Sequence, residues 1–283
     1  MRRIVLNDPC PEPGPSLDGD AGRVLQAGML RLLGAHTGPE GTVDYARLAA
    51  SAAFGAVVQS ARLLQRVDLD RLPDRAGRLA FWINVYNALV VHGIVHLAVR
   101  RTTWEVWNFF GRVSYRIGGV VVSLDEIEHG LLRDNARRVF PPLRPFRRRD
   151  PRRALAVSPP DSRIHFAITC GAQSCPPVGV YRSADIDRQL DLATRNFVNQ
   201  EVRLDGRGRI ECSKLFRWYR DDFARPDGIR AFLLRYLDDG PVRTALARDV
   251  PPCGAVRPYR WRLQHPPADP YWSRAGGHRA GGP

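Results

Sequence analysis

The chain has 283 residues, of which 44% are hydrophobic and 25% are charged, with a formal net charge of +14. This composition is that of a soluble globular protein with a full core, and it excludes a small domain that depends on disulfides. The longest apolar run, residues 88–99, is interrupted by two histidines and a glycine. It is shorter than the roughly 20 residues that span a bilayer, so no membrane segment is expected, and no membrane is expected as a partner.

The positive charge comes almost entirely from arginine. Of the 43 basic residues, only Lys214 is a lysine. Such a bias indicates a general preference for arginine codons rather than a selected phosphate-binding patch. A nucleic-acid partner is therefore not expected, and the expected partner is a small-molecule or peptide substrate.

The two ends of the chain differ in composition from its middle. Residues 1–22 and 266–283 are rich in proline, glycine and polar residues without periodicity, which predicts disorder. The remaining residues, 23–265, are expected to form one globular domain. Only three apolar residues precede Asn7, too few for the core of a signal peptide, so a cytoplasmic location is expected.

The first half of the chain is predicted to be mainly helical. Apolar residues recur at helical spacing over residues 22–34 and 45–67, and a very apolar helix is expected over 79–99. Residues 112–123 read as a β-hairpin that turns at Gly118 and Gly119. A capping box formed by Ser123 and Glu126 predicts that a helix begins directly afterwards.

The second half alternates between short strands and helices. Residues 140–153 are rich in proline and arginine and predict a surface loop, and residues 164–169 predict a strand. A helix over 183–200 and a hairpin over 202–211 follow. Further helices are expected from about Leu215 and Pro226, and a last strand over 259–263. The predicted fold class is α+β, a single domain whose helical N-terminal half packs on a small, mostly antiparallel sheet.

Two asparagines lie within the most apolar helix. Asn84 and Asn87 are three residues apart and share one face of a helix that is apolar all round. A buried amide must have fixed partners. Either the two amides cap the backbone of another segment, or they line a polar site and orient an imidazole or an oxyanion. His92 and His96 are spaced as in helical metal sites but lack the accompanying glutamate, which favours a structural role.

A glutamate and a histidine are adjacent on the helix that Ser123 opens. Glu128 falls within the apolar stripe of this helix, and His129 lies at the edge of that stripe. A buried carboxylate needs a partner, for which Arg133 is the structural candidate. The alternative is that Glu128 and His129 belong to an active site as acid, base or orienting group.

Two cysteines follow the predicted strand. His165 would share a strand face with Thr169 and lie roughly 16 Å from Cys170, so it could not easily act as the base for that thiol. Cys170 or Cys175 could be a nucleophile if a neighbour lowers its pKa. The alternatives are two inert thiols or a pair that forms a disulfide.

Several motifs of the chain resemble those of one known family, the domain of unknown function 547. They are Val43–Tyr45, Ala80–Leu89, Ser123–His129 with Leu132 and Arg133, Arg163–Pro176, Ser213–Tyr219 with Asp222 and Phe223, and Tyr259–Gln264. Together they cover roughly residues 43–264.

The resemblance implies a single domain with a fold similar to papain-like or transglutaminase-like thiol enzymes. The order of residues would be rearranged, because Glu128 and His129 precede Cys170. The closing motif of the family usually reads Tyr-Asp-Trp-Ser-Leu-Asn, whereas this chain has Arg260 and Gln264 in place of the acid and the final amide. If that acid orients a catalytic histidine, the site is altered or inactive here.

These observations lead to three hypotheses for function. The first is a thiol-dependent hydrolase or acyl-transfer enzyme without a cofactor. Its residues would be Cys170 as nucleophile, Cys175 as second choice, His129 as base, Glu128 or Asn87 as orienting group, and Asn84 and His165 nearby. The second is a non-catalytic binding or scaffold module with a structural polar network. The third is a metal site formed by His129, His165 and a cysteine.

Overall fold

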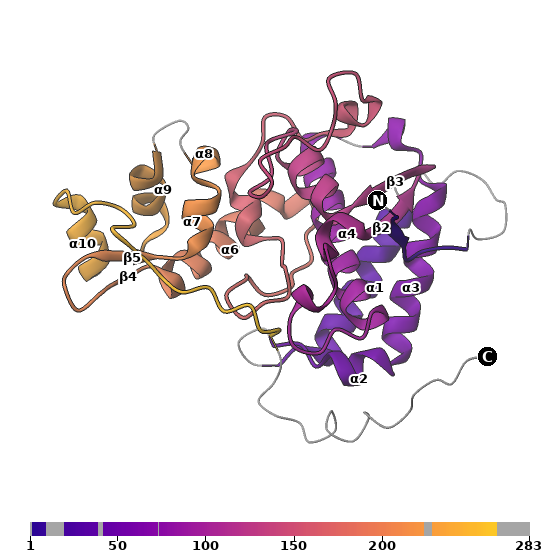
Figure 1. Ribbon diagram of the computed structural model, residues 1–283, viewed down its shortest axis with the longest axis horizontal. Coiled ribbons are helices and arrows are strands. Elements are labelled where there is room, and N and C mark those ends of the chain that lie inside the picture. The colour runs from indigo at the N-terminus through magenta and orange to yellow at the C-terminus, as the bar shows by residue number, and fades with distance from the viewer. Residues whose placement is uncertain (1, 10–19, 39–41, 73, 224–227, 265–283) are drawn as a thin grey trace.

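The computed structural model describes residues 2–9, 20–38, 42–72, 74–223 and 228–264. It shows a single α+β domain, as predicted, with helices predominating. In Figure 1, α1 to α5 and β1 to β3 lie together on one side, α7 to α10 with β4 and β5 lie on the other, and α6 lies between them. Residues 10–19 and 265–283, which include most of the predicted disordered ends, lie outside the described residues.

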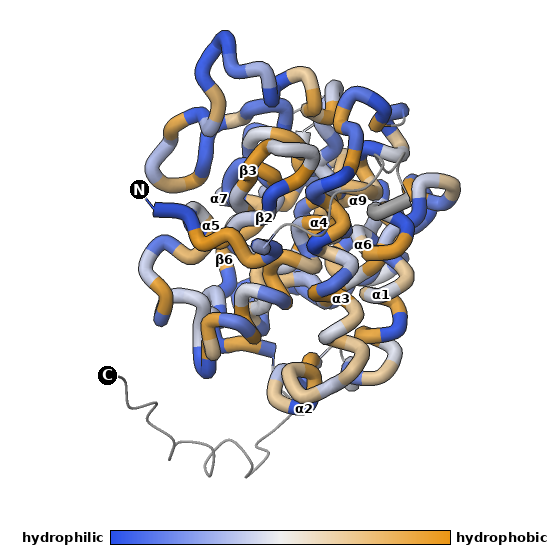
Figure 2. Tube along the Cα trace, turned by 90° about the vertical axis from the view of Figure 1, so that its right-hand side faces the viewer, coloured by the Kyte–Doolittle hydropathy of each residue, from blue (hydrophilic) through white to orange (hydrophobic). Residues whose placement is uncertain are grey.

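The first part is built around one helix. Its elements are β1 (Ile4–Val5), α1 (Asp20–His36), α2 (Tyr45–Ala49), α3 (Ala52–Leu63), α4 (Arg75–His96), α5 (Phe109–Arg112), β2 (Val113–Ile117) and β3 (Val120–Ser123). Short 3₁₀ turns occur at Leu64–Arg66, Leu69–Arg71 and Thr103–Glu105. In Figure 2 α4 lies between β2 and α1, and it contacts both.

Helix α4 begins where Asp74 accepts a hydrogen bond from the amide of Gly77. Apolar side chains surround it, so it is buried from Leu79 to Ile94. Among the described helices it alone is long and apolar enough to cross a membrane, but 83% of the relevant window is buried inside the protein. A buried core helix passes the same test. His92 is also buried here, and its Nδ1 lies 2.9 Å from the Tyr115 hydroxyl, consistent with a structural role.

The N-terminal residues differ from the prediction. Residues 2–9 were expected to be disordered, but β1 pairs in parallel with β2, which forms the predicted hairpin with β3. Asn7 is fully buried, and its side-chain amide donates to the carbonyls of Ala61 and Arg116. The apolar side chains of Ile4 and Leu6 pack in the core, and this packing orders a segment that has no periodicity of its own.

The second part has its own hydrophobic cluster, with Phe166, Phe216 and Phe223 among its members. Its elements are α6 (Ile186–Glu201), β4 (Arg203–Leu204), β5 (Ile210–Cys212), α7 (Lys214–Trp218), α8 (Arg220–Phe223), α9 (Gly228–Tyr236), α10 (Pro241–Ala247) and β6 (Ala255–Val256). The hairpin of β4 and β5 was predicted, and β6 pairs with β5 in parallel. The expected single antiparallel sheet is therefore two small mixed sheets.

Two predicted strands are absent from these described segments. Residues 164–169 were expected to be extended, but Ser162–Phe166 form a 3₁₀ helix, because Asp161 accepts from the amide of Arg163 and caps this turn. Residues 259–263 form only an isolated bridge, between Leu263 and Ala172. In the first place a local side-chain cap overrides the apolar alternation that suggested a strand, and in the second place backbone bonds to residues 171–174 do so.

Candidate active site

The two asparagines of α4 hold the segment that carries the cysteines. Asn84 donates to the carbonyl of Tyr181 at 2.7 Å and accepts from its amide at 2.8 Å. Asn87 donates to the carbonyls of Ala167 and Gly179 and accepts from the amide of Thr169. We call this pair the amide clamp. Its amides cap the backbone of another segment, the first of the two alternatives that the sequence left open.

The C-terminal segment holds the same loop from its other side. The amides of Gln173 and Ser174 donate to the carbonyls of Arg262 and Arg260. Gln264 donates to the carbonyl of Cys175 at 2.8 Å. The loop from residue 170 to residue 175 contains no regular secondary structure, but residues 260–264 bond to it and α4 bonds to the chain on either side of it.

Four cysteines form two disulfides. Cys170 is bonded to Cys175, and Cys212 is bonded to Cys253 across 41 residues. The hydroxyl of Tyr259 lies 3.2 Å from Sγ of Cys170 and 3.0 Å from Sγ of Cys175. Of the alternatives for the first pair, the structure contains the disulfide.

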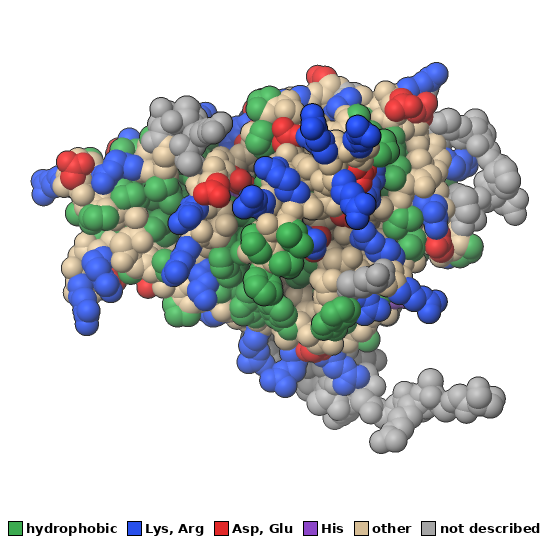
Figure 3. Space-filling model, turned by 45° about the horizontal axis from the view of Figure 1, so that its top comes forward, with side chains coloured by type: hydrophobic (Ala, Val, Ile, Leu, Met, Phe, Trp, Pro, Cys, Tyr) green, Lys and Arg blue, Asp and Glu red, His purple; other side chains and the backbone are tan. Residues whose placement is uncertain are grey.

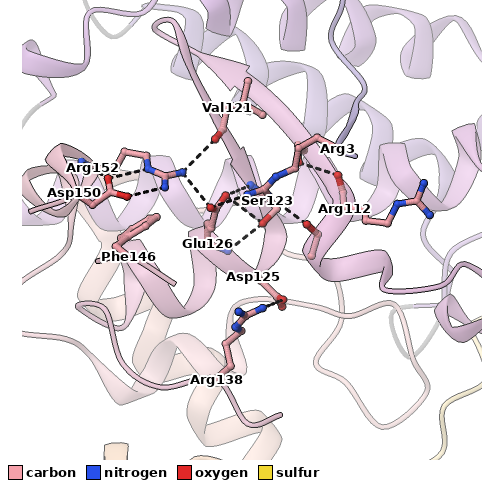
Figure 4. A network of polar contacts seen from close by, with 12 residues as sticks. Arg3, Arg112, Val121, Ser123, Asp125, Glu126, Arg138, Phe146, Asp150 and Arg152 are labelled. Carbon is pink, nitrogen blue, oxygen red and sulfur yellow. Dashed lines mark hydrogen bonds and ion pairs between the residues drawn. The ribbon is translucent and has the colours of Figure 1, made fainter. Parts of the chain in front are cut away.

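The helix that opens at Ser123 has the predicted capping box. Ser123 Oγ accepts from the amide of Glu126, and the Glu126 carboxylate accepts from the amide of Ser123. Figure 4 shows that the same carboxylate also receives Arg3 at 2.7 Å and Arg152 at 3.0 Å. The N-terminal segment and the loop after this helix are thus both bound to its first turn.

This helix is a π-helix over residues Glu126–Leu132. The amide of Arg133 donates to the carbonyl of Glu128, five residues back, and that of Asn135 donates to Gly130 in the same way. π-turns are rare and occur frequently at functional sites. The π-turn carries Glu128 and His129, which are both buried, as the sequence predicted for Glu128.

Glu128 is held by two tyrosines. Oε1 accepts from the Tyr219 hydroxyl at 2.6 Å, and Oε2 accepts from the Tyr86 hydroxyl at 3.2 Å. Burial alone would raise the pKa of this carboxyl, but the neighbouring histidines, the Tyr219 hydroxyl and Arg133 hold it below its usual value. Glu128 is therefore an ionised carboxylate in a buried position.

Arg133 bonds directly to one histidine and, through the half-buried Asp222, to a second. Its guanidinium binds both carboxylate oxygens of Asp222, at 2.5 and 2.9 Å, and donates to Nδ1 of His129 at 2.7 Å. Oδ2 of Asp222, which accepts from Nε of Arg133, also lies 2.7 Å from Nε2 of His165. The ring of His165 stacks on Tyr219 at 3.8 Å. We call these residues, together with Glu128, the histidine cluster.

These contacts fix the protons on both imidazoles. Arg133 has only donors, so Nδ1 of His129 must accept and its proton lies on Nε2. Burial would raise the pKa of Asp222, but hydrogen bonds from His165 and Arg133 lower it well below its usual value. The ionised Asp222 can only accept, so His165 carries its proton on Nε2 and has the lone pair on Nδ1.

Both imidazoles are neutral near pH 7. Burial lowers the pKa of His129 to about 4, and Arg133 adds to this effect while Glu128 opposes it. Burial also lowers the pKa of His165, although the hydrogen bond to Asp222 opposes the shift. The cluster therefore contains two carboxylates, one guanidinium and two uncharged rings.

The histidine cluster and the disulfide face one cavity of about 380 Å³. Its polar wall contains Asp125, Glu128, His129, His165, Thr169, Cys170 and Cys175. Its apolar wall contains Tyr86, Trp104, Phe110, Val139, Phe140, Ile168, Leu215, Trp218, Tyr219, Tyr259 and Trp261. A concave, mainly apolar space with a few convergent polar groups and perturbed pKa values is typical of a ligand or active site.

The structure brings together five of the seven residues proposed from the sequence. Glu128, His129, His165, Cys170 and Cys175 line the cavity; Asn84 and Asn87 are not among the described residues that line it. Within the described residues, no group of three or more His, Cys, Asp or Glu side chains is placed to hold a metal ion. The metal hypothesis therefore gains no support.

The sequence analysis missed the residue that orients a histidine. This residue is Asp222, not the position of Arg260, whose side chain is exposed. Tyr219 and Tyr259 were also missed as contacts of Glu128 and the sulfurs. All three lie in motifs that carried the family resemblance, but nothing in the sequence indicated what they contact.

Comparison with known proteins gives one match. The model of a family described as "Protein of unknown function, DUF547" matches residues 69–198. Residues 69–198, which make up less than half of the chain, are therefore similar to this family. The matched DUF547 segment includes the amide clamp, the π-turn and both sulfurs of the cavity, whereas Asp222 and Tyr259 lie beyond it. No curated protein and no solved structure matches the chain. The matching family has no assigned function, so the match assigns no reaction to this chain.

Proposed function

We propose that this protein is a thiol-dependent hydrolase or acyl-transfer enzyme that acts in the cavity. The observation that carries the proposal is the histidine cluster, because it gives two neutral imidazoles opposite roles at a cavity that also contains two sulfurs. Nδ1 of His165 has a lone pair for proton abstraction, while Nε2–H of His129 is a donor. These roles reverse the expectation that His129 is the base.

The reaction requires the reduced protein. Two equivalents of a small thiol reduce the bond between Cys170 and Cys175 and leave as their own disulfide. His165 then takes the proton of the Cys170 thiol, and the thiolate attacks an acyl carbonyl. Nε2–H of His129 donates to the oxyanion, and His165 returns the proton to the leaving group. Water hydrolyses the thioester and restores the thiol.

Asp222 is a positioning residue in this scheme. It holds the His165 ring in the tautomer that has the lone pair on Nδ1, while Arg133 keeps Asp222 ionised. Glu128 lies 3.7 Å from Nδ1 of His129 and adds negative charge beside that ring. Its charge also raises the pKa of His165, so it stabilises the positive charge that the His165 ring carries between taking and returning the proton.

The test is selective alkylation with and without reduction. After mild reduction at neutral pH, iodoacetamide is expected to modify Cys170 faster than Cys10, as measured by mass spectrometry of peptides. His165→Gln should slow this reaction by roughly a hundredfold, the range for loss of a general base. His92→Gln, which changes a buried histidine bonded to Tyr115, serves as the control. If neither Cys170 nor Cys175 reacts faster than Cys10, the thiol mechanism is wrong.

One observation favours the second hypothesis, a binding module. The disulfide leaves no thiol in the cavity, and the amide clamp is bonded to backbone alone. In that case the cavity binds an apolar ligand without chemistry. Ligand binding, followed by tryptophan fluorescence, would then be unchanged in Cys170→Ser and in His165→Gln, whereas an enzyme would lose turnover of a chromogenic ester in both.

The two disulfides also bear on the cellular compartment in which the protein is found. Disulfides persist in oxidising compartments and are rare in the reducing cytosol. The cytoplasmic location expected from the sequence stays a prediction, and we propose an oxidising compartment instead. Thiol trapping in intact cells tests this: protected Cys212 and Cys253 would support the proposal, and free thiols at both would overturn it.

A further inference from the structure

The large exposed hydrophobic side chains gather at the mouth of the cavity. Five of those in the described residues lie in two short segments: Trp104 at 68% exposure, Trp107 at 72%, Val139 at 40%, Phe140 at 89% and Leu143 at 59%. Trp104, Val139 and Phe140 also line the cavity. Single exposed hydrophobics are normal, but such a group marks a binding surface. We call these five residues the apolar rim.

The loop that presents part of the rim is fixed at its base. Asn135 exchanges two hydrogen bonds of 3.0 Å with the backbone of Phe146. Arg138 forms an ion pair with Asp125 at 3.1 Å, as Figure 4 shows. Phe146 packs so closely on Gly130 of the π-turn that a methyl group there would clash. Phe140 and Leu143 therefore project from a rigid base rather than from a free loop.

Positive charge surrounds the rim. Residues 137–149 contain six arginines and no acidic residue, and Arg260 and Arg262 flank Trp261 in the cavity wall. The acidic groups of this region are engaged: Glu105 accepts from the amides of residues 100–102, and Asp125 is paired with Arg138. Figure 3 shows a face on which hydrophobic side chains gather among basic ones.

We propose that the apolar rim docks on the surface of an anionic lipid bilayer. Tryptophan and phenylalanine insert favourably at the boundary between headgroups and acyl chains, and arginines bind the lipid phosphates. An acidic protein partner fits less well, because a side chain with 89% exposure at a loop tip protrudes instead of lining a groove. The inference goes beyond the proposed reaction, since docking needs no chemical step.

The absence of a predicted membrane segment does not bear on this surface. A spanning helix requires a long apolar run, whereas interfacial binding requires a few exposed apolar side chains and positive charge. Docking through the rim would place the mouth of the cavity against the bilayer. The cavity would then take up an amphiphile directly from the membrane.

The test uses the full chain in its oxidised form and vesicles that are sedimented with bound protein. The protein is expected to bind vesicles of phosphatidylglycerol and phosphatidylcholine at least about tenfold more strongly than vesicles of phosphatidylcholine alone. High salt should reduce this preference because it screens the arginines. Equal binding to both vesicles, or binding to neither, would overturn the proposal.

Matched variants distinguish binding through the apolar rim from non-specific hydrophobic binding. Phe140→Ser with Leu143→Ser should reduce binding to anionic vesicles by about tenfold or more. Leu30→Ser with Leu192→Ser, which changes two exposed leucines on α1 and α6, should leave it unchanged. Circular dichroism checks that both proteins are folded. An equal loss of vesicle binding in both double variants would show that the apolar rim is not the docking surface.

A charge series completes the test. Arg147→Gln, Arg148→Gln and Arg149→Gln should each lower binding about fivefold. Arg31→Gln, Arg47→Gln and Arg207→Gln, at exposed positions outside the loop, should have smaller effects. If the rim instead joins two copies of the chain, the protein will dimerise without vesicles, Phe140→Ser will abolish the dimer, and vesicle binding will be absent.

Discussion

The amide clamp and the histidine cluster are both buried and polar, but they are bonded in different ways. The side-chain amides of Asn84 and Asn87 form hydrogen bonds with backbone groups of the segment that carries the cysteines. The histidine cluster instead bonds side chain to side chain, from His129 through Arg133 and Asp222 to His165, and faces the cavity. The first contains no ionisable group, whereas every polar contact in the second depends on protonation.

The difference separates two roles. A neutral side-chain amide bonds to backbone amides and carbonyls in the way that another backbone would. It therefore holds the bonded segment in place at every pH. A charged network is costly to bury and sensitive to the loss of any one partner. We therefore expect changes in the clamp to affect folding, and changes in the cluster to affect pH dependence and reactivity.

The largest effect is expected from Asn87→Ala. The change leaves the carbonyls of Ala167 and Gly179 and the amide of Thr169 without their side-chain partner. Unpaired buried polar groups destabilise, and we expect the free energy of unfolding to fall by about 3 kcal/mol or more. Urea denaturation measures this. Gln173→Ala, which removes an exposed amide from the same loop, is the control and should change the value little.

The second prediction concerns acid. The pKa of His129 is lowered from 6.5 to about 4, so below pH 6.5 the unfolded chain binds a proton that the folded chain does not. Stability therefore falls as the pH decreases from 6.5 to about 4, by up to ~3 kcal/mol from this group. The lowered pKa of His165 acts in the same direction.

His129→Gln tests this assignment. Glutamine can still accept from Arg133 but does not titrate, so the fall in stability between pH 6.5 and pH 4 should become shallower. Asp222 contributes at lower pH, because a carboxyl with a lowered pKa loses its stabilising effect only as it is protonated. An unchanged slope in the variant would show that His129 is not a neutral buried ring.

The smallest effect is expected from Arg260→Asp, which restores the acid found in the closing motif of the family. The Arg260 side chain is exposed, and its backbone alone holds Ser174. Surface changes of this kind are usually within about 0.5 kcal/mol. Stability and the alkylation rate of reduced Cys170 should therefore stay as in the unaltered protein. A large change in that rate would give position 260 a part in the site.

Local patterns predicted the elements that local bonds determine. The hairpins, the capping box at Ser123 and the burial of Glu128 depend on residues a few positions apart, and all three are present. The similarity to the DUF547 family could also be predicted from motifs. Helical periodicity likewise located α1, α3, α4 and α6.

Contacts between distant segments could not be predicted in this way. Residues 259–263 form a bridge instead of the predicted strand because their backbone bonds to residues 171–174, about 90 residues earlier in the chain. Asp222 reaches His165 across 57 residues, and no spacing in the sequence indicates that contact. The sequence therefore identified candidate residues, but it did not indicate which of them are hydrogen-bonded to one another.

The geometry of the π-turn depends on the number of residues in its segment more than on the identity of any one of them. Its hydrogen bonds span five residues instead of four, so it holds one residue more than an α-helical turn. Deleting one residue between Glu126 and Leu132 would rotate everything beyond the deletion by about 100°. Arg133 would then no longer point at Asp222. A deletion within this turn would therefore separate the two histidines.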